Sequence, residues 1–372
     1  MSSTNLSLIH ANLAIKCFNK LIENSQGECV IYSPISLAIA LSMTYVGSSG
    51  ETKEEMKKFL VGEENDEDLH EHFNEFLSSL SSNEKSLLQS VNKIYVKDGF
   101  SLLESFTQNI EKYYKGQFEQ VDFTSPNTCH EINDFVEKST NNIIKDLISP
   151  DDLDALTRLI LINAIYLKRM WFVKFDKNAT KIDDFFITHN TTRKVDMMFK
   201  KDKFSYYEDD EYQILQLEYE GKEQEMVILL PKERNTLLEK LPTFDGQKLF
   251  DLIDSTDLLT VKVYLPKLKV ESTHQLHETF SDLGMKIPFT DNADFSSMTT
   301  EEPLKISKII QKAFVEVDEE GTEAAAATAI TMCRVTSINF STPREYIFRA
   351  DHPFIYFIMD NQRNILFTGI YQ

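Results

Sequence analysis

One short segment, residues 317–332, limits the folds open to this chain more than any other feature of its sequence. It contains four consecutive alanines after an acidic start, and Ala and Glu both favour a helix. With the period of two that a strand has, however, one face holds only small or apolar side chains and the other carries Glu323. The first face consists of Thr322, Ala324, Ala326, Thr328, Ile330 and Met332, and the second of Glu323, Ala325, Ala327, Ala329 and Thr331.

As a strand, residues 322–332 could enter a closed core on their small face without burying an unpaired charge. A segment that is an exposed loop in one state and a buried strand in another would have this composition. Periodicity alone does not choose between the helix and the inserting strand, so this choice stays open at the level of the residues.

The rest of the chain predicts an α+β fold in a single domain that spans residues 1–372. Hydrophobic residues make up 42% of the sequence, enough for a large core, and no Ser-, Gly- or Pro-rich linker divides it. Helical spacing of apolar residues predicts helices over 6–21, 35–45, 52–60, 100–114, 128–144 and 273–283. β-Branched and apolar runs predict strands over 91–96, 157–167, 184–187, 212–219, 226–230, 259–265, 314–317, 346–348, 354–359 and 365–371. Helices early and strands late are typical of large, mostly antiparallel sheets.

The acidic charge of the chain excludes two classes of partner. The formal net charge is −20, and such a surface repels the phosphates of nucleic acids and anionic membrane lipids. The longest apolar stretch, residues 31–46, is interrupted by Pro34 and several Ser and Thr residues, so we expect a buried helix rather than a membrane span. The N-terminus lacks the pattern of a cleavable signal peptide, which predicts a cytoplasmic protein or one released to the extracellular space without a leader.

The usual catalytic and metal-binding patterns do not occur in the sequence. Gly-x-Ser-x-Gly, the phosphate-binding loop, Gly-x-Gly-x-x-Gly and His-Glu-x-x-His are all missing. His70 and His72 lie in an acidic run, and His274 and His277 share a predicted helix face without a third ligand, so we expect surface positions for all four. The four cysteines fit neither a disulfide framework nor a metal site. We therefore expect no enzyme activity, no metal and no cofactor.

The segment Glu319-Glu-Gly-Thr-Glu-Ala-Ala-Ala-Ala-Thr328 resembles the proximal hinge of the reactive-centre loop of serpins, in its inhibitory form. Similar motifs follow in the family's order at 32–36, 40–43, 47–56, 132–140, 163–166, 171, 265–268, 293–296, 351–354 and 367–369. On these motifs the chain is identified as a member of the family, closest to its leaderless, ovalbumin-like branch. It departs from the family at Gln311, where many members have a histidine, and at Arg169, where glycine is usual.

The resemblance implies the serpin fold, with large, mostly antiparallel sheets, about nine helices and an exposed reactive-centre loop over approximately 319–345. It also implies suicide-substrate inhibition of serine proteases. In that mechanism the loop is cleaved, remains bound as a stable acyl-enzyme and inserts into the main sheet as an extra strand. The hinge would comprise Glu319, Glu320, Gly321, Thr322, Glu323, Ala324, Ala325, Ala326, Ala327 and Thr328. The regions where the sheet opens, called shutter and breach, would comprise Ser33, Ser36, Asn163, Trp171 and Gln311.

The position of the cleaved bond stays open between two neighbours. The family's usual spacing from Glu319 places it between Val335 and Thr336, which suits an elastase-like protease. The preceding bond, between Arg334 and Val335, offers a trypsin-like protease the cationic side chain that its acidic pocket binds. We expect the adjacent Cys333 to be an ordinary exposed thiol.

The main alternative is a non-inhibitory serpin with a storage, carrier or chaperone role. The small hinge residues argue against it, because members that lost inhibition often carry charged or bulky residues there. A hydrolase has no supporting motif. Residues 62–85 are acidic where glycosaminoglycan-activated relatives need a basic patch, so we expect no heparin cofactor, and we expect a monomer.

Overall fold

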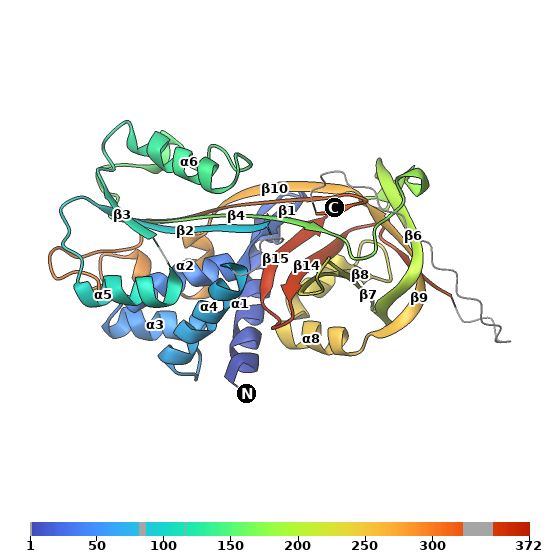
Figure 1. The fold of residues 1–372 in the computed structure, drawn as a ribbon, viewed down its shortest axis with the longest axis horizontal. Coiled ribbons are helices and arrows are strands. Elements are labelled where there is room, and N and C mark those ends of the chain that lie inside the picture. The colour runs from blue at the N-terminus through green and yellow to red at the C-terminus, as the bar shows by residue number, and fades with distance from the viewer. Residues whose placement is uncertain (1, 82–86, 116, 323–344) are drawn as a thin grey trace.

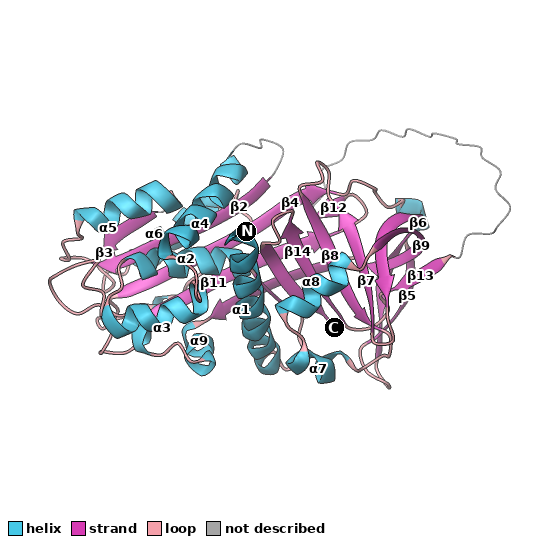
Figure 2. Cartoon of the chain, turned by 90° about the horizontal axis from the view of Figure 1, so that it is seen from below, coloured by secondary structure: helices cyan, strands magenta, loops and turns pink. Residues whose placement is uncertain are grey.

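The computed structural model describes residues 2–81, 87–115, 117–322 and 345–372. Most helices gather at one end of an elongated molecule, and a region rich in strands forms the other end (Figure 1, Figure 2). The described residues contain nine α-helices, which confirms the expected number: α1 (Ser2–Asn24), α2 (Pro34–Val46), α3 (Gly50–Leu60), α4 (Asp66–Ser81), α5 (Glu104–Asn109), α6 (Thr128–Ser139), α7 (Leu237–Lys240), α8 (Gly246–Asp254) and α9 (His277–Leu283).

The strands form two sheets. The six-stranded sheet has the order β10–β11–β12–β4–β2–β3, and the nine-stranded sheet has the order β1–β15–β14–β8–β7–β6–β9–β13, with β5 paired to β6. Their bounds are β1 (Val30–Tyr32), β2 (Leu87–Lys97), β3 (Gln117–Val121), β4 (Leu159–Met170), β5 (Lys181–Phe186), β6 (Thr192–Glu208), β7 (Tyr212–Glu218), β8 (Gln224–Pro231), β9 (Asp257–Pro266), β10 (Leu268–Gln275), β11 (Lys308–Val317), β12 (Gly321–Thr322), β13 (Tyr346–Arg349), β14 (Phe354–Asp360) and β15 (Ile365–Tyr371). Three of these pairings are parallel (β4–β11, β2–β3 and β9–β13), and the others described are antiparallel, so the predicted α+β class with mostly antiparallel sheets is confirmed.

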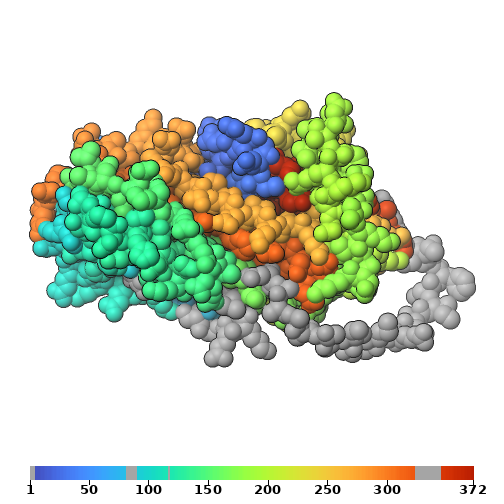
Figure 3. Space-filling model, turned by 90° about the horizontal axis from the view of Figure 1, so that it is seen from above, coloured from blue at the N-terminus to red at the C-terminus, as the bar shows by residue number. Residues whose placement is uncertain are grey.

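β4 is a central strand of the six-stranded sheet and is buried on both faces, as its continuous apolar run predicts. Leu161 and Ile165 belong to the main core, whereas Ile160 and Ile162 belong to a second core that includes residues of α6. α6 lies across the outer face of the sheet (Figure 1), and Figure 3 shows orange residues, the colour range of β10 and β11, at the surface beside it. β4 is thus fixed between two hydrophobic layers.

Ser33 and Pro34 begin α2, as the sequence predicts. Ser33 is extended and its side chain accepts a hydrogen bond from the backbone N of Ser36, while Pro34 occupies the first turn, where no backbone N–H is needed. Residues 34–45 are all buried, so most of the longest apolar stretch is a buried helix. No helix in the described ranges is long and apolar enough to cross a membrane.

The helix predicted over 273–283 is wrong in its first part. Residues 273–275 belong to β10, which pairs with β11 along its whole length, and α9 begins only at His277. The ladder with β11 supplies the backbone hydrogen bonds of this segment, and this tertiary pairing overrides the local helical pattern. The predicted end at Gly284 is confirmed, since its φ of 109° is the left-handed conformation that a helix C-terminus favours.

Two other predictions differ from the structure. The helix predicted over 128–144 ends at Ser139, because Asn141 and Asn142 adopt left-handed backbone conformations with φ of 50° and 61°. β6 was missing from the predicted strands, although it has 17 residues. Many of its side chains are exposed and charged, so its apolar pattern is weak.

Three histidines that we expected on the surface are partly or fully buried. His72 is 6% exposed, and its Nε2 lies 3.0 Å from Oδ1 of Asn364. The Nδ1 of His70 lies 2.5 Å from the hydroxyl of Tyr114, and His274 contacts a backbone carbonyl of β1 at 2.9 Å. These three histidines therefore contribute to the packing of the core and its edges. Among the described residues, no group of three or more side chains is suited to bind a metal ion.

Burial of His10, in α1, makes the stability of the fold depend on pH. Its ring is 9% exposed and stacks on Phe73, and its Nε2 lies 2.9 Å from the carbonyl of Leu60. Burial and the nearby His72 lower the pKa of His10 from 6.5 to about 4. The unfolded chain therefore binds this proton more tightly than the folded chain. The stability that neutral His10 contributes is complete above pH 6.5 and is lost as the pH falls toward 4.

We predict that acidification from pH 6.5 to 4 costs about 2–3 kcal/mol of unfolding free energy through His10 alone. Urea denaturation at several pH values measures the loss. His10→Gln keeps a donor for the Leu60 carbonyl but cannot titrate, so it should reduce the pH dependence by that amount. An unchanged slope in His10→Gln would show that other groups cause the acid sensitivity.

Candidate functional site

The candidate site is the line along which β4 and β11 pair directly, which we call the seam. Ile160–Tyr166 of β4 pair in parallel with Lys308–Phe314 of β11. Beyond these residues the two strands separate, and β12 lies between them. In β12, Thr322 pairs with Val317 of β11 on one side and with Arg169 of β4 on the other. The sheet is therefore closed along the seam and admits the first residues of the Ala-rich segment at one end.

An aromatic stack holds β12 at this end. The rings of Trp171 and Tyr219 are parallel, with centroids 4.6 Å apart. The indole Nε1 of Trp171 donates to the carbonyl of Asp318 at 2.9 Å, and the hydroxyl of Tyr219 lies 2.7 Å from the hydroxyl of Thr322. Thr322 is fully buried, so a larger side chain there would displace the stack.

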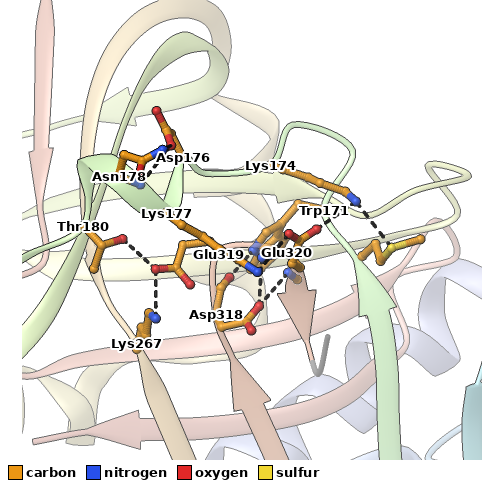
Figure 4. Close-up of polar contacts among 12 residues, drawn as sticks. Trp171, Lys174, Asp176, Lys177, Asn178, Thr180, Lys267, Asp318, Glu319 and Glu320 are labelled. Atoms are coloured by element: carbon orange, nitrogen blue, oxygen red, sulfur yellow. Dashed lines mark hydrogen bonds and ion pairs between the residues drawn. The ribbon is translucent and has the colours of Figure 1, made fainter. Parts of the chain in front are cut away.

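Ion pairs fix the two acidic residues that precede β12 (Figure 4). Glu319 accepts hydrogen bonds from Lys267 at 2.8 Å and from Thr180 at 2.7 Å. Burial alone would raise the pKa of Glu319, but these bonds hold it below its usual value. Glu320 pairs with Lys174 at 3.0 Å and with Lys177 at 3.2 Å. Charges contributed by three lysines therefore anchor the base of the loop to the body of the protein.

Arg169, which departs from the family's usual glycine, lies buried beside the stack. Its Nη1 donates to the carbonyl of Glu220 at 3.0 Å and its Nη2 lies 3.4 Å from the carboxylate of Glu223, while its Nε has no partner in the described part of the chain. The backbone of Arg169 also restricts which residue can occupy position 321 in β12. A Cβ added to Gly321 would lie 2.1 Å from the carbonyl oxygen of Arg169, so only glycine fits at this position.

Polar side chains meet at the middle of the seam, where the sheet packs on α2. Gln311 accepts a hydrogen bond from the backbone N of Ser33 at 2.7 Å and donates to the Ser33 carbonyl at 2.9 Å and to Oδ1 of Asn163 at 2.6 Å. Asn163 donates in turn to the hydroxyl of Ser36 and to the side-chain oxygen of Asn92. The four residues that the resemblance assigns to the shutter thus form one hydrogen-bonded cluster, which bridges β4, β11 and α2.

Some residues of this site were missing from the sequence-based set. Asn92 and Ser90 of β2 join the cluster. Asn92 is a polar side chain within the strand predicted over 91–96, which was a usable signal, whereas Ser90 precedes that strand. Tyr219, Lys267 and Thr180 carried no such signal, because they reach the loop from segments distant in sequence. The remaining predicted residues, Glu323 to Thr328, Cys333, Arg334, Val335 and Thr336, lie outside the described residues.

Replacement of Gln311 by alanine should destabilise the protein by about 2–4 kcal/mol, because it leaves both backbone groups of Ser33 without a partner inside the core. Chemical denaturation of purified protein measures this. Gln247→Ala removes an exposed glutamine of α8 and should change the stability by less than about 0.5 kcal/mol. Equal effects of the two changes would contradict the role given to the cluster.

Comparisons with known proteins agree with this architecture. The family model described as Serpin (serine protease inhibitor) matches residues 9–372. A serpin-like protein of Thermococcus kodakarensis is 39% identical over 346 residues, covering 91% of this chain and 79% of its own length. The antitrypsin of Bombyx mori is 33% identical and covers 99% of this chain and 95% of its own.

Among solved structures, the crystal structure of Serpin48 from the insect Tenebrio molitor is similar. It has a TM-score of 0.88 and 32% identity, and the match covers 100% of this chain and 98% of that one. That protein is described as a highly specific serpin. The family model, the relatives and the solved structure agree on one conclusion. This chain belongs to the serpin family.

Proposed function

We propose that this serpin inhibits serine proteases as a suicide substrate. One observation carries the proposal: β12 already occupies the place between β4 and β11 at one end, while the two strands pair directly over the rest of the seam. The Ala-rich segment continues from β12. A cut in the loop would free this segment to extend β12 along the seam as a complete strand, which is a known type of switching transition.

The register of β12 gives the partners that the inserting strand would meet. Because β12 is antiparallel to both neighbours, an inserted strand in the same register would bring Ala324 opposite Leu167 of β4 and Val315 of β11. Both of these partners are fully buried. A closely packed core accepts only small side chains without rearrangement, and this requirement accounts for the alanines of the hinge.

Two residues further along the small face, the same register continued along the seam would bring Thr328 opposite Asn163 and Gln311. Insertion must therefore break the hydrogen bond between these two amides. The hydroxyl of Thr328 supplies a donor and an acceptor at the same level, so the buried amides regain a partner. The polar cluster thus delays insertion at first and then accepts the inserted strand.

The chemical steps follow from protease chemistry. The protease serine attacks the carbonyl of Arg334 or of Val335, and the peptide bond breaks with release of the protonated amine of the next residue. The ester that results joins the protease to the end of the hinge segment. Insertion carries this ester to the opposite end of the sheet before water can hydrolyse it. Inhibition is therefore a competition between insertion and deacylation.

The test is to mix the purified protein with trypsin and, separately, with an elastase, and to analyse the products on denaturing gels. We expect a band that resists SDS near the summed masses of inhibitor and protease. The N-terminus of the released peptide, Val335 or Thr336, identifies the bond. Cleavage without such a band, across a wider panel of serine proteases, would favour the non-inhibitory alternative.

A second prediction concerns the inserting face. Ala324→Arg places a charge opposite Leu167 and should slow insertion, so that the protease cleaves most molecules without being trapped. We expect at least a tenfold rise in the number of inhibitor molecules consumed per protease inhibited, which corresponds to about 1.4 kcal/mol in the competing barriers. Glu323→Arg, on the opposite face, is the matched control and should change this number little. Equal effects of the two variants would contradict the register.

A further inference from the structure

A pocket of about 180 Å³ lies where β6 and β7 separate in the nine-stranded sheet, and we call it the split pocket. The ladder between the two strands runs from Glu208 and Gln213 to Ser205 and Gln216, where it ends. Beyond this point β6 continues beside β9, and β7 continues beside β8. The split pocket therefore belongs to the strand-rich end of the molecule, where β6, β7 and β9 lie (Figure 1).

Apolar side chains form part of the wall of the split pocket. Trp171, from the segment that follows β4, is 2% exposed and presents its ring to the pocket from the closed side. Val173 is half-buried, and Leu258 of β9 is 66% exposed. Pockets for drug-sized ligands measure about 300–1,000 Å³, so this smaller pocket suits a ligand with a single ring. An aromatic ring would pack well on the indole of Trp171.

The polar side chains of the split pocket offer hydrogen-bond donors and a net positive charge. Ser205 and Gln216 are direct neighbours across the ladder, so their Cβ atoms lie about 5 Å apart. Within the described part of the chain, the Ser205 hydroxyl and the amide N–H groups of Gln216 have no partner, and Lys203 forms no ion pair. The one carboxylate of the lining, Glu218, is already paired with Lys222 at 2.7 Å.

This combination fits an anion better than a neutral or cationic ligand. Two lysines stand against one carboxylate in the lining, although the chain as a whole has a net charge of −20. A carboxylate accepts hydrogen bonds and donates none, so it matches a group of unpartnered donors. Bonds from an ammonium group to a carboxylate are stronger than bonds between neutral groups.

We propose that the split pocket binds a small aromatic carboxylate, with its ring against Trp171 and its carboxylate held by Lys203, Ser205 and Gln216. Such a site requires neither cleavage nor insertion of the loop, so it goes beyond the proposed function and is tested independently of it. The indole of Trp171 also donates to the carbonyl of Asp318, just before β12. The ligand would thus contact the residue that holds the base of the loop.

The experiment is a titration of the intact protein with phenylacetate, followed by tryptophan fluorescence and by calorimetry. Trp171 is the only tryptophan in the chain, so a change in its fluorescence reports on the wall of the split pocket. We expect a dissociation constant of about 0.1–1 mM. Phenylacetamide has the same ring without the charge and should bind at least about fivefold more weakly, and this difference should shrink in about 1 M NaCl.

Two matched variants test the position of the carboxylate. Lys203→Met should weaken phenylacetate binding by about fivefold to tenfold. Lys181→Met removes another exposed lysine without an ion pair in the described ranges, from β5 and outside the pocket lining, and should leave the affinity unchanged. Ser205→Ala should weaken binding by a few fold.

Three results would overturn the proposal. One is the absence of a response to about 10 mM phenylacetate in both fluorescence and calorimetry. The others are equal binding of phenylacetamide and equal affinities of Lys203→Met and Lys181→Met. None of these results would bear on the inhibition of proteases.

Discussion

The direct pairing of β4 with β11 ends at Tyr166 and Phe314, and the behaviour proposed for the molecule depends on that limit. A sheet whose strands separate at one end offers unpaired backbone groups to any segment that can reach them. Here the chain itself supplies the segment, because β11 leads through a short turn into β12. β4 and β11 already pair directly over Ile160–Tyr166 and Lys308–Phe314, and the proposed insertion would give both strands a new set of ladder hydrogen bonds.

Two sets of interactions would oppose early insertion in the proposed mechanism, and they act at different places. At the open end, Glu319 and Glu320 are held by lysines, and Thr322 is held under Tyr219. At the middle of the seam, Gln311 and Asn163 join the two strands through their side chains. Neither amide titrates, so this part of the barrier does not depend on protonation. α6 packs across the outer face of the sheet, and its residues form a second hydrophobic core with residues of β4.

The sequence predicted the central strand and the capped start of α2 from local patterns. The resemblance to a family, and not a local pattern, singled out Ser33, Ser36, Asn163 and Gln311, which the structure brings together in one cluster. Prediction from the residues was limited to what neighbours in the sequence decide. It failed where tertiary pairing decides the local structure, as in residues 273–275. The burial of His72 was a missed local signal, since Leu69, His72, Phe73 and Phe76 share one helical face and all four are buried. The pocket lined by Leu156, Arg158, Asp291 and residues 302–305 could not be predicted, because it joins residues far apart in the sequence.

The most direct test of the account is a crystal structure of the loop-cleaved protein. We predict a new strand between β4 and β11 in which Ala324 lies opposite Leu167 and Thr328 opposite Asn163, with the hydrogen bond between Gln311 and Asn163 broken. A cleaved protein in which Ile160–Tyr166 still pair directly with Lys308–Phe314 would contradict it.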